Sequence, residues 1–283
     1  VFKTNNVHYG TSANIGVNVN DIFLTARYSR QDFADYRVPG ETFIYNGFEL
    51  PIENERLKNT AGDESNFSVS SGIHRSWGIT RLLFSHYSLD AGLFSGAVGI
   101  PRSYVLTDDG NPRDIDVPRQ SVDHYRVSLN QTLFLGSHHF TFDIGYQRNL
   151  RREFSEPEFH SIPDSQLDDP NDKLATELRL ETFSIASHYE HRFASGWKNI
   201  FGINAQWQQN QRGGFEFLLP NFQTFRGGIY TISEKEIHEH FLINGGLRFD
   251  IGSNDSEYFR QHVWDSNENI IDSLVSPATD DMF

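Results

Sequence analysis

The chain of 283 residues contains no cysteine and a single methionine. The absence of cysteine excludes a disulfide framework, a thiolate metal site and a cysteine nucleophile. Long apolar runs are also missing, because no stretch approaches the roughly 20 apolar residues that a membrane-spanning helix needs. No signal peptide opens the chain, so we interpret it as a mature product or an internal piece.

Positive charge is scarce, since 24 Lys and Arg stand against 38 Asp and Glu and give a formal net charge of −14. This balance disfavours a nucleic-acid partner, whose binding draws on clustered Lys and Arg. The mean hydropathy of −0.52 is typical of a soluble protein. A membrane β-barrel has a similar value, because only alternate residues of its strands contact lipid.

Apolar and polar residues alternate with a period of two in many segments. In the stretch "GSHHFTFDIGYQRN" (136–149), the apolar set is Phe140, Phe142, Ile144 and Tyr146, and the intervening set is Thr141, Asp143, Gly145 and Gln147. Similar alternation recurs along the chain and predicts about ten strands, with no convincing amphipathic helix. The sequence therefore predicts an all-β protein.

The predicted connections alternate between short and long. Short turns are expected near residues 20–21, 75–76, 136–137, 195–196 and 238–239, and long polar stretches near 31–62, 89–119, 150–176, 209–225 and from about 252. This asymmetry is typical of outer-membrane barrels, with tight periplasmic turns and long extracellular loops. An ordinary β-sandwich is the alternative. Two aromatic girdles are expected, one toward the long-loop ends (Tyr28, Tyr146, Tyr189, Trp207) and one beside the short turns (Trp77, Trp197).

Several segments carry a family resemblance: "LKNTAGDESNFSVSSGIHRSWGITRLLFSHYSLDAGLFSGAVGIPRSY" (57–104), "DIGYQRNLRREFSEPEF" (143–159), "NIFGINAQWQQNQRGGFEFLLPNF" (199–222) and "FLINGGLRFD" (241–250). They resemble the barrel of TonB-dependent outer-membrane receptors of the iron-complex or siderophore type. The resemblance implies a transmembrane antiparallel β-barrel of 22 strands in the Gram-negative outer membrane. It also implies a ferric chelate or similar ligand, contact with lipid and lipopolysaccharide, and coupling to TonB through a plug domain.

The chain departs from this family pattern, because it shows no plug-like segment, no TonB-contacting box and only about ten strands. Ten strands taken from a larger barrel leave two unpaired edges, which lipid does not tolerate. We therefore expect residues 1–283 to be one barrel segment of a longer receptor, without enzymatic activity or a cofactor.

A closed ten-stranded barrel is the alternative, acting as an outer-membrane protease or a diffusion porin. The protease needs paired acids, for which the candidates are Asp114 with Asp116 and Asp123 with His124. Adjacent residues of a strand point to opposite faces, so Asp123 and His124 are not expected to act together. For all of these candidates, we favour the interpretation that they are solvated loop acids.

Aromatic and basic residues of the long loops and the lumen wall are the candidate ligand-binding residues: Tyr104, Arg148, Arg151, Phe215, Phe217 and Phe222. Arg148, Arg151 and Arg152 form a basic cluster that suits an anionic chelate or lipopolysaccharide phosphates. No metal site is expected. Glu236, His238 and His240 have ligand spacing but lie in a short turn, His138 and His139 flank another turn as solvated residues, and the loop acids match no calcium-binding motif.

Overall fold

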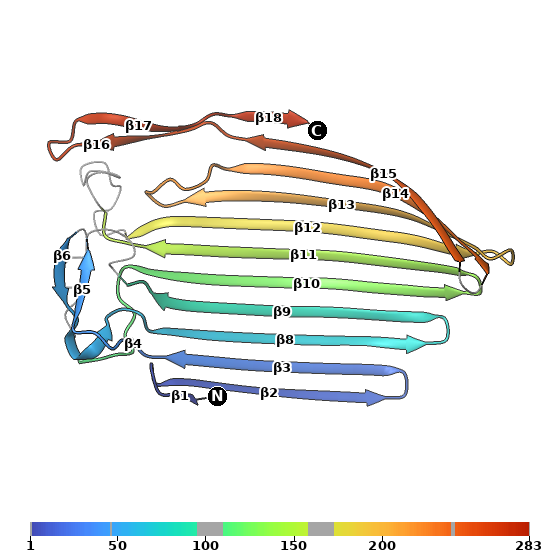
Figure 1. Ribbon diagram of the computed structural model, residues 1–283, viewed down its shortest axis with the longest axis horizontal. Helices are drawn as coiled ribbons and strands as arrows, with labels where there is room; N and C mark the ends of the chain where they lie inside the picture. The colour runs from blue at the N-terminus through green and yellow to red at the C-terminus, as the bar shows by residue number, and fades with distance from the viewer. Residues whose placement is uncertain (1, 46, 95–109, 158–172, 239–240, 283) are drawn as a thin grey trace.

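The computed structural model describes residues 2–45, 47–94, 110–157, 173–238 and 241–282. Its main feature is one antiparallel sheet of twelve strands (Figure 1). In spatial order the strands are β1 (Phe2–Lys3), β2 (His8–Val19), β3 (Ile22–Phe33), β8 (Gly62–Arg75), β9 (Gly78–Gly92), β10 (Arg119–Leu135), β11 (His138–Phe154), β12 (Leu174–Arg192), β13 (Trp197–Gly213), β14 (Phe222–His238), β15 (Phe241–Ser256) and β18 (Thr279–Met282). Ten of them have at least 12 residues, which confirms the strand number expected from the sequence. The short strands β1 and β18 are the additional ones.

Three small two-stranded sheets lie in the connections. They pair β4 (Tyr36–Arg37) with β7 (Arg56–Leu57), β5 (Thr42–Tyr45) with β6 (Phe48–Pro51), and β16 (Phe259–Trp264) with β17 (Ile270–Ser276). A 3-10 helix, Glu53–Glu55, lies beside β7. The described residues include no helix that is long and apolar enough to cross a membrane.

Short and long connections lie at opposite ends of the sheet, as the sequence predicts. The long connections 34–61, 93–118, 155–173 and 214–221 follow strands that end at the left in Figure 1, and the short turns join strands at the right. Asn20 and Gly136 have positive φ values of 55° and 66°, which suit the tight hairpin turns at those positions. Tyr189 was expected near the long-loop end, but it lies four residues from the short turn after Arg192, so that part of the girdle prediction is wrong.

Register divides the sheet into two chemically different faces, because directly paired residues point to the same side. One row of cross-strand partners crosses seven strands and consists of Val69, Phe84, Val127, Tyr146, Phe183, Trp207 and Phe225. The row one residue away consists of Ser68, Ser85, Arg126, Gln147, Thr182, Gln208 and Thr224. We call the side with the first row the apolar face and the side with the second row the polar face.

The apolar face carries large side chains that are open to the surroundings. Leu247, Phe249 and Ile203 are 79%, 66% and 53% exposed. The only hydrophobic residues buried in the described part of the chain are Ala34, Ala61 and Ala175. A soluble sandwich would bury such a face in a core, whereas a membrane barrel presents it to lipid. Phe140, Phe142 and Ile144, which the alternation places on one side of their strand, lie on this apolar face, and it also carries Phe201, Ile203, Phe241, Ile243 and Phe249.

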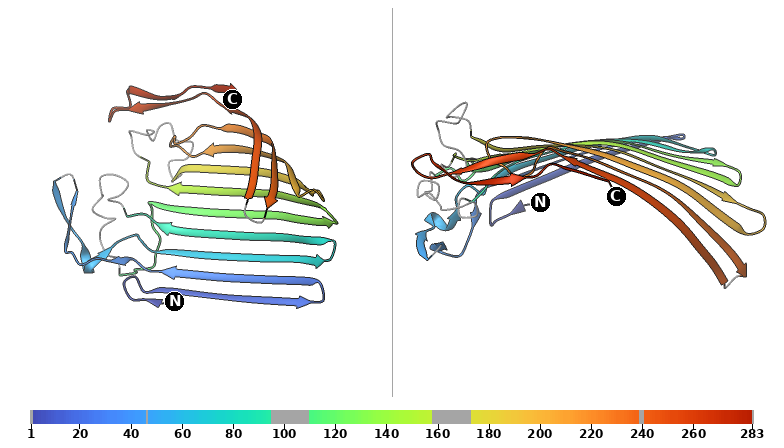
Figure 2. Two further views of the ribbon diagram at one scale, coloured as in Figure 1. Left: turned by 45° about the vertical axis from the view of Figure 1, so that its right-hand side comes forward. Right: turned by 90° about the horizontal axis from the view of Figure 1, so that it is seen from above.

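Glycine opposite an aromatic residue recurs on the polar face. Gly202 pairs with Tyr230, and a Cβ added at Gly202 would lie 2.0 Å from the Tyr230 ring. Gly72 pairs with Phe23 in the same way, and a Cβ added at Gly72 would lie 2.5 Å from the Phe23 ring. The missing side chain therefore leaves room for the ring to lie flat across the neighbouring strand. The sheet as a whole is a curved wall (Figure 2), and no strand pairing in its described portion joins β2 to β15.

Candidate functional site

The polar face is a wall of hydrogen-bonded side chains. The Arg248 guanidinium donates to Asp250 at 2.7 Å through Nε and to Asn204 Oδ1 at 3.1 Å through Nη2. On another part of the face, Arg81 Nε donates to Ser70 Oγ at 2.9 Å. Side chains of this kind suit water or the polar surface of another protein segment, not lipid.

The long connections 34–61 and 93–118 are fastened to each other by a polar cluster, which we call the loop anchor and which comprises the buried Asp35, Lys58 and Asn59 and the more exposed Asp114 and Asp116. Asn59 is fully buried. Its Nδ2 donates to the carbonyls of Leu93 (3.1 Å) and Pro118 (2.7 Å), and its Oδ1 accepts from the Asp116 backbone N–H at 2.9 Å. One amide side chain thus ties the connection 34–61 to the connection 93–118.

Charged members of the loop anchor are paired. Lys58 is 5% exposed, and its Nζ lies 2.9 Å from Asp114 and 3.7 Å from Asp116. Asp35 accepts backbone N–H bonds from Thr60 at 2.7 Å and from Ala61 at 3.1 Å. Burial raises the pKa of the Asp35 carboxyl, while these backbone donors and Lys58 act in the opposite direction.

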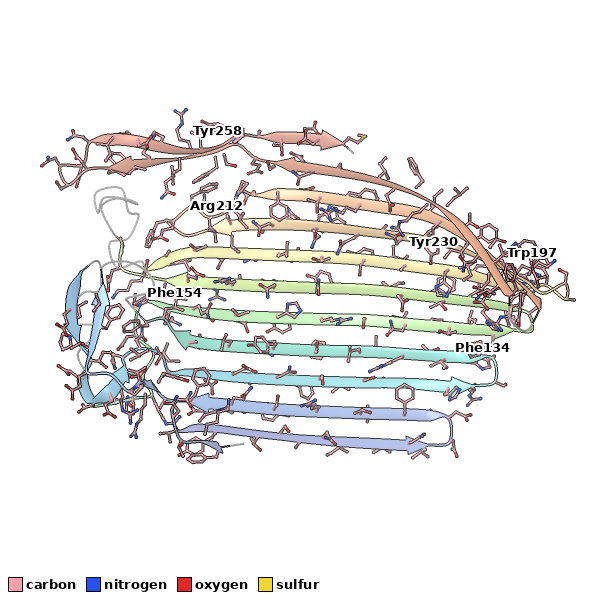
Figure 3. The ribbon with its side chains drawn as sticks, viewed as in Figure 1. Phe134, Phe154, Trp197, Arg212, Tyr230 and Tyr258 are labelled. Atoms are coloured by element: carbon pink, nitrogen blue, oxygen red, sulfur yellow. The ribbon has the colours of Figure 1, made fainter. Side chains whose placement is uncertain are left out.

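Arg212 fastens a second long connection. Its guanidinium carbon lies 4.1 Å from the ring centroid of Phe259 and 5.8 Å from that of Phe217, and the two rings stack at 4.3 Å. Nη2 also donates to the carbonyls of Gly214 (3.1 Å) and Glu216 (3.4 Å). We call this group the arginine clamp; Arg212 lies at the long-loop end of β13 in Figure 3.

Gln261 of β16 reinforces the arginine clamp. It accepts from the Phe217 backbone N–H at 2.9 Å and donates to the Phe215 carbonyl at 3.1 Å. The connection 214–221 is therefore held against β16 by both side chains and backbone. Sequence reasoning missed Arg212, Phe259 and Gln261, because no local motif links β16 to residues that are 42 or more positions away.

A polar hollow of about 330 Å³ lies next to the arginine clamp. Its lining consists of amide and carboxylate side chains together with Arg212 and Phe222. The amides and carboxylates are Gln209, Asn210, Gln211, Asn221, Gln223, Asp255 and Glu257. Asn221 holds one side of it, donating to Glu257 at 2.8 Å and accepting from the Arg212 backbone N–H. Its groups can both donate and accept hydrogen bonds, so the hollow suits a small polar ligand group.

The structure does not gather the candidate ligand-binding residues into one site. Phe222 lines the polar hollow, whereas Phe217 stacks within the arginine clamp. Arg148 lies on the apolar face and Arg151 on the polar face, because they are three positions apart on one strand and side chains alternate between its faces. Arg152, on the same face as Arg148, forms an ion pair with Glu177 at 3.5 Å. Tyr104 lies outside the described residues.

The residues considered for a protease site do not form the catalytic pairs that a protease needs. Asp114 and Asp116 pair with Lys58, so the expectation that they are simply solvated is wrong for Asp114, which is 28% exposed. Asp123 lies 3.2 Å from His86 Nε2, while His124 contacts Asn149 from the other face. The predicted separation of Asp123 from His124 is confirmed.

The described residues contain no group of three or more His, Cys, Asp or Glu that could hold a metal. His240 and the loop acids Asp108, Asp109, Asp164, Asp168, Asp169 and Asp172 lie outside the described residues. His138, expected to be solvated, instead stacks on the His191 ring with 4.3 Å between centroids.

Comparison with solved structures gives matches over nearly the whole chain. The FrpB iron transporter from Neisseria meningitidis (F3-3 variant) matches 98% of this chain and 41% of its own, with a TM-score of 0.62 and 14% identity. The ferric-catecholate import receptor Fiu from E. coli K12 matches 98% of this chain and 48% of its own, with a TM-score of 0.59 and 8% identity. The chain thus spans less than half the length of either structure.

No protein-family model and no curated protein matches the sequence. The likeness to solved structures nevertheless confirms, at the level of the fold, the resemblance to TonB-dependent outer-membrane receptors. The twelve-stranded sheet matches part of the β-barrel fold of both structures.

Proposed function

We propose that the chain forms part of the barrel wall of an outer-membrane receptor that imports a scarce ligand, a ferric siderophore or another iron complex, with energy from TonB. The observation that carries this proposal is the sheet itself. One face is apolar, the other is polar, and all the long connections between its long strands lie at one end. Such a wall separates lipid from a wet lumen and presents its loops to one side of the membrane.

Residues 1–283 belong in this proposal to one barrel domain of a longer protein. β2 pairs with β1 through Phe2 and Lys3 only, and β15 pairs with β18 through four residues. Most of both edges is therefore without a partner in the described portion, and open edges are not tolerated in lipid. Further strands and a plug domain that contacts TonB complete the receptor.

The barrel wall does no chemistry in this function; it binds and admits the ligand. Phe222 beside the polar hollow, Arg151 on the polar face, and the loop residues Tyr104, Phe215 and Phe217 are the proposed ligand-binding residues. Arg148 and Arg152 face the other way, so we assign them to lipid or lipopolysaccharide phosphates. The names of the two similar structures, an iron transporter and a ferric-catecholate import receptor, support iron as the cargo.

Growth assays test the ligand class. A strain lacking the receptor is grown with a single ferric siderophore, haem, cobalamin or zinc as the limiting nutrient. We expect loss of growth on one iron source and its recovery with the intact gene. Normal growth on every iron source, with failure only on cobalamin or zinc, would overturn iron as the cargo. The assignment of the protein as a transporter would still stand.

The role of the long-loop end in ligand binding can be tested in the same strain. Residues 215–219 are replaced by a Gly-Ser segment of equal length, and the short turn at Asn20 and Asp21 is replaced by Gly-Ser in a control. The loop replacement should weaken ligand binding while the barrel stays folded, because loops carry little of the ladder hydrogen bonding. Equal ligand affinity in both variants would place binding elsewhere.

A further inference from the structure

A stack of rings lies on the apolar face beside the short turns of β11 and β12. His138 and His191 are direct cross-strand partners, and Tyr189 precedes His191 on the same face. The stack continues from Tyr189 to Phe140, with 4.7 Å between centroids. Two imidazoles and a phenol therefore meet in a place that the proposed import function does not use.

Three polar atoms converge within the stack. His138 Nδ1 lies 3.1 Å from His191 Nδ1 and 2.7 Å from the Tyr189 hydroxyl. A neutral imidazole carries its proton on one nitrogen and a lone pair on the other. When both rings carry the proton on Nε2, the two Nδ1 lone pairs lie close together and repel each other, and a cation bound to both nitrogens removes this repulsion.

The spacing fits ligands of one metal ion. Zinc binds imidazole nitrogen at about 2.0–2.1 Å in tetrahedral geometry, which places two nitrogen ligands about 3.3 Å apart. The two imidazole planes are inclined by 27°. Both rings must therefore turn about their Cβ–Cγ bonds for the two lone pairs to point at one ion.

We propose that His138 and His191 form a binding site for a divalent transition metal, with the Tyr189 oxygen as a third ligand or an outer hydrogen-bond partner. Neutral nitrogen ligands without thiolate or carboxylate favour Cu²⁺, Zn²⁺ or Ni²⁺ over Ca²⁺ and Mg²⁺. Water completes the coordination on the side of the short turns. This site is independent of the proposed receptor function and of its cargo.

Binding is measured on the intact protein purified from outer membranes in detergent, stripped with EDTA and titrated with CuCl₂ or ZnCl₂ alone. We expect one saturable equivalent, and for Cu²⁺ an electron paramagnetic resonance spectrum with two nitrogen ligands. His138→Ala and His191→Ala should each reduce the affinity at least about tenfold, because losing a residue that merely orients a metal ligand already costs roughly 10–100-fold. Tyr189→Phe should have a smaller effect, because it retains the ring stack.

His74→Ala is the matched control, because His74 is an exposed histidine at the short-turn end of β8 and should leave the affinity unchanged. Folding of each variant is checked by circular dichroism, and His138→Asn and His191→Asn replace any alanine variant that does not fold. Absence of saturable binding, a spectrum with oxygen ligands only, or equal affinity in the wild type and the His138 and His191 variants would overturn the site.

Discussion

The short-turn end and the long-loop end of the sheet are stabilised in different ways. At the short-turn end, the ladder continues almost to the turn, and residues such as Asn20 and Gly136 supply the required positive φ. At the long-loop end, order depends on individual side chains, namely those of the loop anchor and the arginine clamp. The ladder is thus specified by a repeating pattern, whereas each loop is specified by a few distant pairs.

If the two regions are stabilised separately, a charge on the lipid side of the ladder should have the largest effect. Ile203→Arg places arginine near the middle of the apolar face and should reduce barrel stability by about 2–4 kcal/mol. Urea unfolding in lipid vesicles measures the change. Thr141→Arg is the control, because Thr141 lies on the polar face between Thr132 and His188 and should tolerate the charge. Equal losses in both variants would mean that the two faces do not differ in environment.

A change in the loop anchor should have a smaller and local effect. Lys58→Met keeps the aliphatic length but leaves Asp114 without its cation, so docking of residues 34–61 should weaken by about 1–3 kcal/mol. Hydrogen exchange of this connection measures docking, and exchange in β8 to β15 should not change. Arg75→Met is the control, because its ion pair with Asp21 at the short-turn end is about half exposed and should contribute little. Faster exchange throughout the ladder would contradict separate stabilisation.

The arginine clamp should respond to the shape of the cation as well as its charge. Arg212→Ala removes the stacking on Phe259 and two bonds to backbone carbonyls, which we expect to weaken docking of 214–221 by about 1 kcal/mol. Arg212→Lys should recover only part of this, because an ammonium lacks the planar fork. Hydrogen exchange at Phe217 is the readout, since its N–H bonds to Gln261. Full recovery with lysine would show that charge alone holds the loop.

The smallest effect should come from pH. Burial raises the pKa of Asp35 above its ordinary value of 3.8, so the docked loop binds this proton more tightly than the undocked loop. Between these two pKa values, the Asp35 contribution to docking should therefore increase as pH falls and decrease as pH rises. The difference in exchange of residues 34–61 between the wild type and Asp35→Asn isolates this contribution. A difference that does not vary with pH would contradict it.

The ladder was predictable from the sequence because its signal is local. The alternation around Phe142 and Ile144 predicts that this segment is a strand and shows which of its side chains lie on the apolar face. Strand spacing also shows that Arg148 and Arg151 must diverge, although proximity in sequence suggested one basic cluster. The loop contacts were not predictable in this way. Lys58 and Asp114 are 56 residues apart, and Arg212 meets a ring 47 residues further on, so nothing in either local sequence identifies the partner.

The pairing order of the main sheet also has a consequence for folding kinetics. From β9 to β14, every strand pairs with the strand that precedes it and the strand that follows it in the chain. Most contacts therefore join segments that are neighbours in the chain. The entropy lost on closing loops is then divided among many small steps, one for each strand added. Each completed hairpin exposes an edge that can act as a template for the next, so this wall can assemble by sequential zippering from any one hairpin.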